Sequence, residues 1–213
     1  MELLKNLIFY VLNTKIYKSI YRLIVEKIIN TLSINNNKIV FISMNGAYGC
    51  NPKYICEEII RRKLPYKLVW VTNLSRKKGN FPREVQLVPY GLRGDIERST
   101  SRVMICNART PYFSAGYCKK TNQRYIQTWH GSYGIKKMEG DCPFAQTAGW
   151  LKASQTDSAN IDCLLSCGSW LTETYIRSFF CSREVIKETG SPRNDVFFTP
   201  VLIPDIKFGD ILT

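Results

Sequence analysis

Histidine is almost absent from this chain, because position 130 holds the single one among 213 residues. The eight cysteines contain no Cys-x-x-Cys pair, and the two nearest in sequence are Cys163 and Cys167. A zinc site would therefore need cysteines alone, or cysteines with a carboxylate. We expect no metal site, and the spacing favours free thiols in a reducing, cytosolic compartment over a disulfide framework.

Long apolar runs and the common phosphate-binding motifs are also missing. No stretch approaches the roughly 20 apolar residues that a membrane-spanning helix needs. The short apolar run from Leu7 to Leu12 is followed by no small-residue cleavage site of a signal peptide. Neither Gly-x-Gly-x-x-Gly nor Gly-x-x-x-x-Gly-Lys-[Ser/Thr] occurs, and no Ser-His-Asp set follows from the spacing. These absences argue against a dinucleotide fingerprint and a P-loop, and we expect no cofactor.

Positive charge is what the sequence has in excess, with a formal net charge of +13. Lysine and arginine form short clusters at residues 61–63, 76–78, 119–120 and 136–137. Such a surface favours anionic partners, whether lipid headgroups, phosphate polymers or nucleic acid. No basic strand carries interleaved aromatic residues, the pattern typical of stacking on nucleic acid, so a nucleic-acid partner is not expected.

Residues 3–32 contain no glycine or proline and predict a helix at the start of the chain. In its second half an apolar stripe lies opposite Lys15, Lys18 and Arg22. The stripe consists of Tyr17, Ile20, Tyr21, Ile24 and Ile28. We interpret residues 1–34 as an amphipathic segment that lies on an anionic membrane surface. Packing of the same stripe on the chain's own domain is equally consistent with the pattern.

From Lys38 onwards, short apolar runs alternate with helical segments. Runs of this kind are typical of strands in a buried parallel sheet. The expected strands are 38–43, 67–72, 85–88, 102–106, 124–128, 162–166 and 184–188. Strands separated by helices in this rhythm predict an α/β fold, a Rossmann-like, doubly wound and mostly parallel sheet over residues 38–200.

The single histidine, His130, comes directly after the strand-like run that ends at Thr128. Ligands of open α/β sheets bind outside the carboxyl ends of the strands, and an imidazole suits proton transfer near neutral pH. Gly131 lets the backbone turn, and Lys136 and Lys137 follow. We interpret His130 as a site residue; a core histidine bonded to a backbone partner is the alternative.

Two further turns carry candidate ligand-binding residues. Asn51 followed by Pro52 predicts a helix start with Asn51 as its N-cap. Backbone N–H groups at that helix start suit a phosphate, although a turn that only connects strand and helix is the alternative. The turn 190–195 contains Arg193, whose guanidinium suits bidentate phosphate binding; a simple helix cap is the other interpretation of this turn.

Three short motifs occur in order along the chain. They are Tyr48-Gly49-Cys50-Asn51-Pro52-Lys53-Tyr54-Ile55, then Thr128-Trp129-His130-Gly131 followed by Lys136-Lys137, then Gly190-Ser191-Pro192-Arg193-Asn194-Asp195. Together they resemble the CDP-glycerol:poly(glycerophosphate) glycerophosphotransferases, the family of the teichoic-acid primases and polymerases. The resemblance covers residues 38–195.

The resemblance implies the acceptor-side half of a two-domain, glycosyltransferase-B-like enzyme, attached peripherally to the cytoplasmic face of the cell membrane. His130 is implied to be the general base that takes a proton from an acceptor hydroxyl, as that oxygen attacks the β-phosphate of CDP-glycerol and CMP leaves. The implied partners are CDP-glycerol, or a similar CDP-polyol donor, and a membrane-linked polyol-phosphate acceptor. The candidate substrate- and phosphate-binding residues are Trp129, Gly131, Ser132, Lys136, Lys137, Asn51, Lys53, Arg193, Asn194 and Asp195.

In this family a second domain holds most of the nucleotide contacts, including a Thr-Asp-Tyr-Ser-Ser-type stretch and another histidine, and neither occurs before Thr213. We therefore expect residues 201–213 to begin a linker, and the chain to need a donor-binding domain encoded downstream or supplied as a second chain. A non-catalytic membrane- or polymer-binding module with the same fold is the second interpretation. A basic nucleic-acid-binding protein is the third.

Overall fold

The computed structural model describes residues 15–75, 80–110, 113, 116–131, 137–142, 144 and 146–198. Several predicted features lie outside these residues: the first half of the leading helix, the basic cluster at 76–78, Ser132, Lys136 and the linker 201–213. All eight cysteines lie within the described residues, and each is a free thiol.

The strands of the described residues form one seven-stranded sheet in the order β3-β2-β1-β4-β5-β6-β7. They are β1 (Asn35–Ile42), β2 (Lys67–Thr72), β3 (Val85–Pro89), β4 (Ser101–Cys106), β5 (Arg124–Gln127), β6 (Cys163–Ser166) and β7 (Ile186–Glu188). Every neighbouring pair is parallel, which confirms the predicted doubly wound fold. The predicted start of the last strand at Glu184 is wrong, because Arg183–Val185 forms a 3₁₀ turn, η6.

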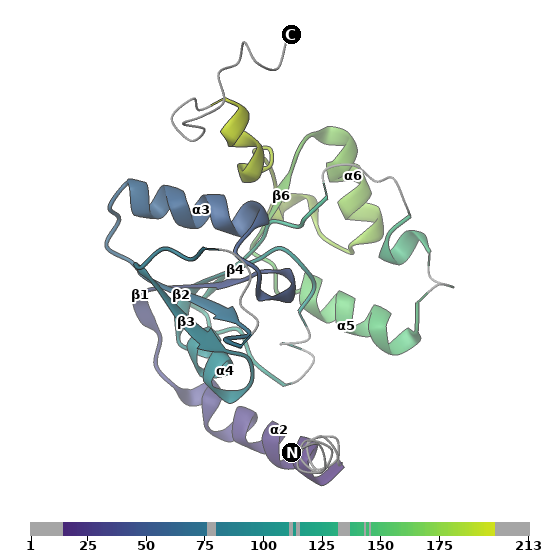
Figure 1. Ribbon diagram of the computed structural model, residues 1–213. Helices are drawn as coiled ribbons and strands as arrows, with labels where there is room; N and C mark the ends of the chain where they lie inside the picture. The colour runs from purple at the N-terminus through teal and green to yellow at the C-terminus, as the bar shows by residue number, and fades with distance from the viewer. Residues whose placement is uncertain are drawn as a thin grey trace.

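Helices cover both faces of this sheet (Figure 1). The α-helices are α2 (Lys15–Lys27), α3 (Cys50–Arg61), α4 (Leu92–Ser99), α5 (Ala148–Ser158) and α6 (Ser169–Ser178). The remaining 3₁₀ turns of the described residues are η1 (Ile29–Thr31), η2 (Met44–Gly46), η4 (Glu139–Asp141) and η7 (Pro192–Phe197). Helix α3 lies on one face, and α2 and α4 lie on the other.

Successive strand residues point into two different cores, as the pleat requires. On the α3 face, Phe41 and Trp70 stack with ring centroids 5.2 Å apart, and Cys56 of α3 packs with them. On the opposite face, Val40 and Val69 are fully buried in a separate aliphatic cluster. Burial on both faces explains why the strands are continuous apolar runs in the sequence.

Helix α2 packs on the domain by one of its sides. Val25 and Ile29, which follow the predicted stripe by one helical position, are buried in the main core, and the Tyr21 hydroxyl hydrogen-bonds the Asp95 carboxylate of α4. A second apolar side of α2 is exposed, formed by Ile20 and Leu23 with exposed fractions of 54% and 56%. Among the described residues, no helix is both long and apolar enough to cross a bilayer. The boundary at residue 34 stays a prediction.

The turn that follows β1 is tightly packed against β2. Gly46 has a φ of +67°, in the left-handed region. A Cβ atom there would lie 2.7 Å from the Tyr90 hydroxyl and 2.8 Å from the Thr72 Cα. The Thr72 hydroxyl also donates a hydrogen bond of 2.8 Å to the Gly46 carbonyl. The carboxyl ends of β1 and β2 are thereby held together at a residue that only glycine fits without strain.

Replacing Gly46 with alanine is expected to lower the free energy of unfolding by about 1–3 kcal/mol, because a side chain in the left-handed region is strained and overlaps its neighbours. Urea unfolding followed by circular dichroism measures this loss. The matched control is Gly49→Ala in the same loop, where the backbone is extended and a Cβ atom would meet nothing within 4 Å. Equal losses in the two variants would contradict the close packing of this turn.

Candidate active site

Three segments that are far apart in the sequence meet at the carboxyl end of β5. The Asn51 side-chain nitrogen donates hydrogen bonds to the carbonyl oxygens of Thr128 and Trp129, each at 3.1 Å. The Asn51 Oδ1 accepts one from the backbone N–H of Arg193 at 3.2 Å. The Arg193 guanidinium donates to the His130 carbonyl at 3.0 Å. The three motifs noted in the sequence are therefore joined directly.

Asn51 is not the N-cap of α3, and that prediction is wrong. The helix begins one residue earlier, at Cys50, after Gly49, and no side chain caps it. Asn51 is 2% exposed. Its amide donates to two carbonyl oxygens, and leaving these unpaired in the interior would lower the stability of the fold. The side chain thus holds the histidine loop, and its predicted contact with substrate stays a prediction.

His130 is half-buried, and its Nδ1 lies 2.6 Å from the backbone carbonyl oxygen of Asn107. A carbonyl oxygen can only accept, so Nδ1 carries the proton and Nε2 keeps its lone pair in the neutral ring. That tautomer can accept a proton from a hydroxyl group at Nε2. The histidine has a backbone partner and also lies at the edge where α/β sheets bind ligands; its role as a site residue stays a prediction.

The Trp129 ring supports the imidazole from one side. The two rings stack with centroids 4.3 Å apart and an interplanar angle of 29°. The rings of Trp129 and Phe179 meet edge to face, with centroids 4.5 Å apart and an interplanar angle of 71°. Trp129 has a φ of +50°, which is a costly conformation for a bulky residue. Its backbone N–H donates a hydrogen bond of 3.0 Å to the Gln127 Oε1. The orientation of the rings is therefore imposed by contacts around them rather than by local preference.

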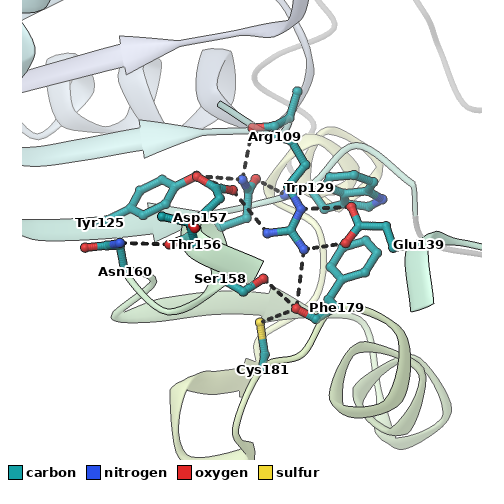
Figure 2. A network of polar contacts seen from close by, with 12 residues as sticks. Arg109, Tyr125, Trp129, Glu139, Thr156, Asp157, Ser158, Asn160, Phe179 and Cys181 are labelled. Carbon is teal, nitrogen blue, oxygen red and sulfur yellow. Dashed lines mark hydrogen bonds and ion pairs between the residues drawn. The ribbon is translucent and has the colours of Figure 1, made fainter. Parts of the chain in front are cut away.

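A buried charge cluster lies next to these rings (Figure 2). The Arg109 guanidinium binds Glu139 through two hydrogen bonds of 2.8 and 2.6 Å, and it binds Asp157 at 3.1 Å. The side chains of Glu139 and Asp157 are only 4% and 1% exposed. Burial raises the pKa of Asp157 to about 6, although Arg109 and Tyr125 act in the opposite direction. A single cation thus faces two buried carboxyl groups.

A cavity of about 370 Å³ opens where the strand order reverses between β1 and β4. Its polar lining consists of Ser43, Asn45, Tyr90, Arg98, Arg109 and Thr110. Asn107 separates this cavity from the histidine, since its Oδ1 accepts from the Met44 N–H at 2.8 Å and its carbonyl holds His130. Such switch points are the usual ligand sites of doubly wound sheets, and the volume is that of a small-molecule pocket.

The other predicted site residues are distributed around this edge. Lys53 lies on α3, 3.8 Å from Glu57, with its ammonium 5.1 Å from the Tyr54 ring centroid. Lys137 is exposed, Gly131 is half-buried beside Trp129, and Asn194 and Asp195 are exposed in η7. Asp195 also lines a groove of about 280 Å³ between α3 and η7. Substrate binding by these residues stays a prediction.

Sequence reasoning missed Asn107 and Arg109. Both follow the strand ending at Cys106, at the carboxyl edge of the sheet. A polar and a charged residue immediately after a buried apolar strand were a usable signal of a site in a parallel sheet. Glu139 and Asp157 carried no comparable signal, because acidic residues in helical segments are common at the surface.

The fold and these contacts define a Rossmann-like α/β protein whose histidine, with its Nδ1 on the Asn107 carbonyl, lies at the carboxyl edge of the sheet. The chain belongs to the CDP-Glycerol:Poly(glycerophosphate) glycerophosphotransferase family, whose model matches residues 24–201. This confirms the family suggested by the three motifs and does not favour a nucleic-acid-binding protein.

Similar proteins of known role are teichoic-acid enzymes. The chain is 28% identical over 192 residues to the teichoic acid poly(glycerol phosphate) polymerase of Bacillus subtilis (strain 168), covering 85% of this chain and 24% of that protein. It is 29% identical over 196 residues to the teichoic acid glycerol-phosphate transferase of Staphylococcus aureus (strain NCTC 8325 / PS 47), covering 84% and 48%. The chain thus spans about a quarter to a half of the length of these relatives.

Solved structures agree with this relationship. The wall teichoic acid polymerase TagF superposes with a TM-score of 0.72 at 30% identity, over 92% of this chain and 47% of that one. A variant of that polymerase soaked with CDPG gives a TM-score of 0.72 at 28% identity, over 91% and 47%. The Rossmann-like fold of this chain therefore matches about half of the longer TagF chain.

Replacing Asn51 with aspartate is expected to destabilise the protein by about 2–4 kcal/mol, because a carboxylate cannot donate to the two carbonyl oxygens and would be buried against them. Thermal unfolding at neutral pH measures the loss. Asn107→Asp is the matched control, since Asn107 is equally buried at 1% and its side-chain oxygen only needs to accept from Met44. The prediction fails if the variant at position 51 is no less stable than the one at position 107.

Proposed function

We propose that this chain is the acceptor-side half of a glycerophosphotransferase that transfers polyol phosphate in the synthesis of teichoic acid or a related cell-surface polymer. One observation carries the proposal: His130 of the family motif lies at the carboxyl edge of the sheet with its Nδ1 proton on the Asn107 carbonyl, which leaves Nε2 free to accept a proton. A cavity of small-molecule size lies on the other side of Asn107. The family match and the names of the relatives supply the substrate class.

In the proposed reaction, which the family resemblance implies, the tautomer of His130 leaves Nε2 as the proton acceptor. An acceptor hydroxyl attacks the β-phosphorus of CDP-glycerol, while Nε2 removes the hydroxyl proton. A new P–O bond forms to the acceptor oxygen, the bond from the β-phosphorus to the oxygen of CMP breaks, and CMP leaves. An unassisted alcohol is a poor nucleophile at neutral pH, so proton removal during attack is where the imidazole lowers the barrier.

The donor nucleotide needs its own binding site, and we propose that a second, donor-binding unit provides it. The relatives are longer than this chain, and a TagF variant was soaked with CDPG. Lys136 and Lys137 follow the histidine loop in sequence, and we propose that at least one of them contacts a phosphate of donor or acceptor, where a cation offsets charge at the transferring group.

Substitution of His130 by glutamine is expected to lower turnover by about 10²–10⁴-fold, the usual contribution of a positioned general base. The assay supplies this chain with the donor-binding half of a family member, CDP-glycerol and a glycerol-phosphate primer, and measures CMP release. The chain without that half is expected to show no turnover. Near-normal rates with His130→Gln, or robust turnover by residues 1–213 alone, would contradict the proposal.

We further propose that the protein attaches to the membrane surface through α2. The exposed apolar side of α2 is not the side that packs on the domain, because Val25 of α2 and Ile29 of the adjoining turn η1 are the residues buried in the core. Ile20 and Leu23 lie on that side with exposed fractions of 54% and 56%. The net charge of +13 adds attraction to anionic lipid.

The double variant Ile20→Ser/Leu23→Ser is expected to bind phosphatidylglycerol vesicles at least about 10-fold more weakly, since each side chain loses up to roughly 1.5–3 kcal/mol of apolar burial. Sedimentation with vesicles measures the partitioning. Leu64→Ser/Leu74→Ser is the matched control, because those leucines are exposed at 42% and 48% outside α2. Equal binding by both double variants would show that α2 does not attach the protein to the vesicles, and the basic clusters would then be the remaining explanation.

A further inference from the structure

Arg109 contacts the surroundings of the histidine by two separate routes. Its guanidinium carbon lies 4.7 Å from the centroid of the Phe179 ring, and Phe179 meets the edge of Trp129, which stacks on His130. The second route is the backbone. Arg109 comes two residues after Asn107, whose carbonyl oxygen accepts the Nδ1 proton of His130. Arg109 is therefore coupled both to the face of the imidazole and to its hydrogen-bond acceptor.

The same arginine fixes the far end of the histidine loop. Glu139 lies in η4 and receives two hydrogen bonds from Arg109. Glu139 and Trp129 both have left-handed backbones, with φ of +42° and +50°. Such strain persists only where neighbouring contacts enforce it, and at Glu139 the bidentate guanidinium is one such contact.

The geometry of the cluster requires the planar guanidinium of Arg109, and the compact ammonium group of a lysine would not serve all of its partners. Three of its nitrogens are used, on Glu139, on Asp157 and on the Phe179 carbonyl. A planar fork can serve these partners together, whereas an ammonium group is one compact charge. Its side chain is 12% exposed, so water cannot easily take the place of a lost bond.

A chain of hydrogen bonds runs from Asp157 of the same cluster to Trp129. The Tyr125 hydroxyl donates to Asp157 at 3.2 Å, and it accepts from the Gln127 side chain at 3.0 Å. The Gln127 nitrogen also donates to the Ala108 carbonyl, beside Arg109, while its Oε1 holds the Trp129 N–H. The loop after β4 and the loop after β5 are thus joined by hydrogen bonds, and Figure 2 shows the cluster beside Trp129.

We propose that Arg109 is a positioning residue for His130: with Phe179 it holds the Trp129 ring on the imidazole, and it fixes the loop whose Asn107 carbonyl selects the Nδ1-protonated tautomer. The effect on catalysis rests on the proposed function, in which Nε2 accepts the hydroxyl proton. The effect on the imidazole itself does not rest on it. An arginine that only stabilised the fold would leave the tautomer of His130 unchanged.

The single histidine makes a direct test available. In ¹⁵N-labelled protein the imidazole signals arise from one residue, and the two ring nitrogens distinguish the tautomers with the ring in its neutral form. The wild-type chain is expected to be protonated at Nδ1. Arg109→Lys keeps the positive charge but loses the planar guanidinium, and Phe179→Leu leaves the ion pairs in place. A mixture of the two tautomers is expected in both variants.

Arg177→Lys is the matched control. Arg177 binds Asp141 through two hydrogen bonds of 2.7 and 2.8 Å, two residues after Glu139, but its side chain is 62% exposed. Its variant should give the wild-type imidazole spectrum. An unchanged tautomer in folded Arg109→Lys and Phe179→Leu would overturn the proposal. Failure of both variants to fold would also overturn it, because the cluster would then determine folding rather than position.

The catalytic arm uses the assay with the donor-binding half. Arg109→Lys is expected to lower kcat by about 10–100-fold, the usual effect of residues that orient a reacting group from behind, with KM for the primer changed less than about 3-fold. A mixed tautomer with unchanged kcat would overturn the positioning role in catalysis. If His130→Gln is fully active, the proposed function fails, yet the imidazole spectra still decide whether Arg109 positions the ring.

Discussion

The carboxamide of Asn51 makes three hydrogen bonds to the backbone of two distant segments, at Thr128 and Trp129 on one side and at Arg193 on the other. These bonds are made in the interior, where each unsatisfied partner costs about 1–3 kcal/mol. The first turn of α3, the loop that holds His130 and the turn after β7 therefore have to form together. The position of the histidine is a tertiary property and not a property of its own loop.

The parallel sheet provides the edge on which these bonds can form. Because β1, β4 and β5 are neighbours and parallel, the residues that follow them emerge side by side. Asn107, which follows β4, then joins the turn after β1 through Met44 and the loop after β5 through His130. One asparagine thus links the loops after three neighbouring strands, β1, β4 and β5. The cavity opens between the loops after β1 and β4.

The sheet could be predicted from the sequence because its information is local. Residues 68–71 of the predicted strand 67–72 are continuously apolar, and the structure has β2 over the same span as the prediction. The prediction failed at Glu184, where only the last three residues of the predicted run pair with β6. There the signal is weak, since Ile186 is the one buried residue of the edge strand β7.

The candidate site could be predicted only in part. His130 and its two companion motifs were found, because a rare residue after a strand and three ordered motifs are visible along the chain. The structural role of Asn51 was not predicted, because its side chain bonds carbonyl oxygens 77 and 78 residues away, whereas local rules favour an N-cap. The Arg109 cluster was missed for the same reason, as its carboxylates come from elements 30 and 48 residues further on.

A buried carboxylate also connects the leading helix with the cavity. Asp95 of α4 pairs with Arg98 at 2.6 Å, and Arg98 lines the cavity at the switch point. The same carboxylate is hydrogen-bonded by Tyr21 of α2 and by Tyr117. The pKa of the Tyr21 hydroxyl is raised to about 12, first by burial and then by its bond to Asp95, so it stays a neutral donor. A helix proposed to lie on the membrane is thus hydrogen-bonded to the carboxylate that holds Arg98, a residue of the cavity lining. Residues 15–34 are accordingly part of the structure that shapes the site, whichever surface their outer side meets.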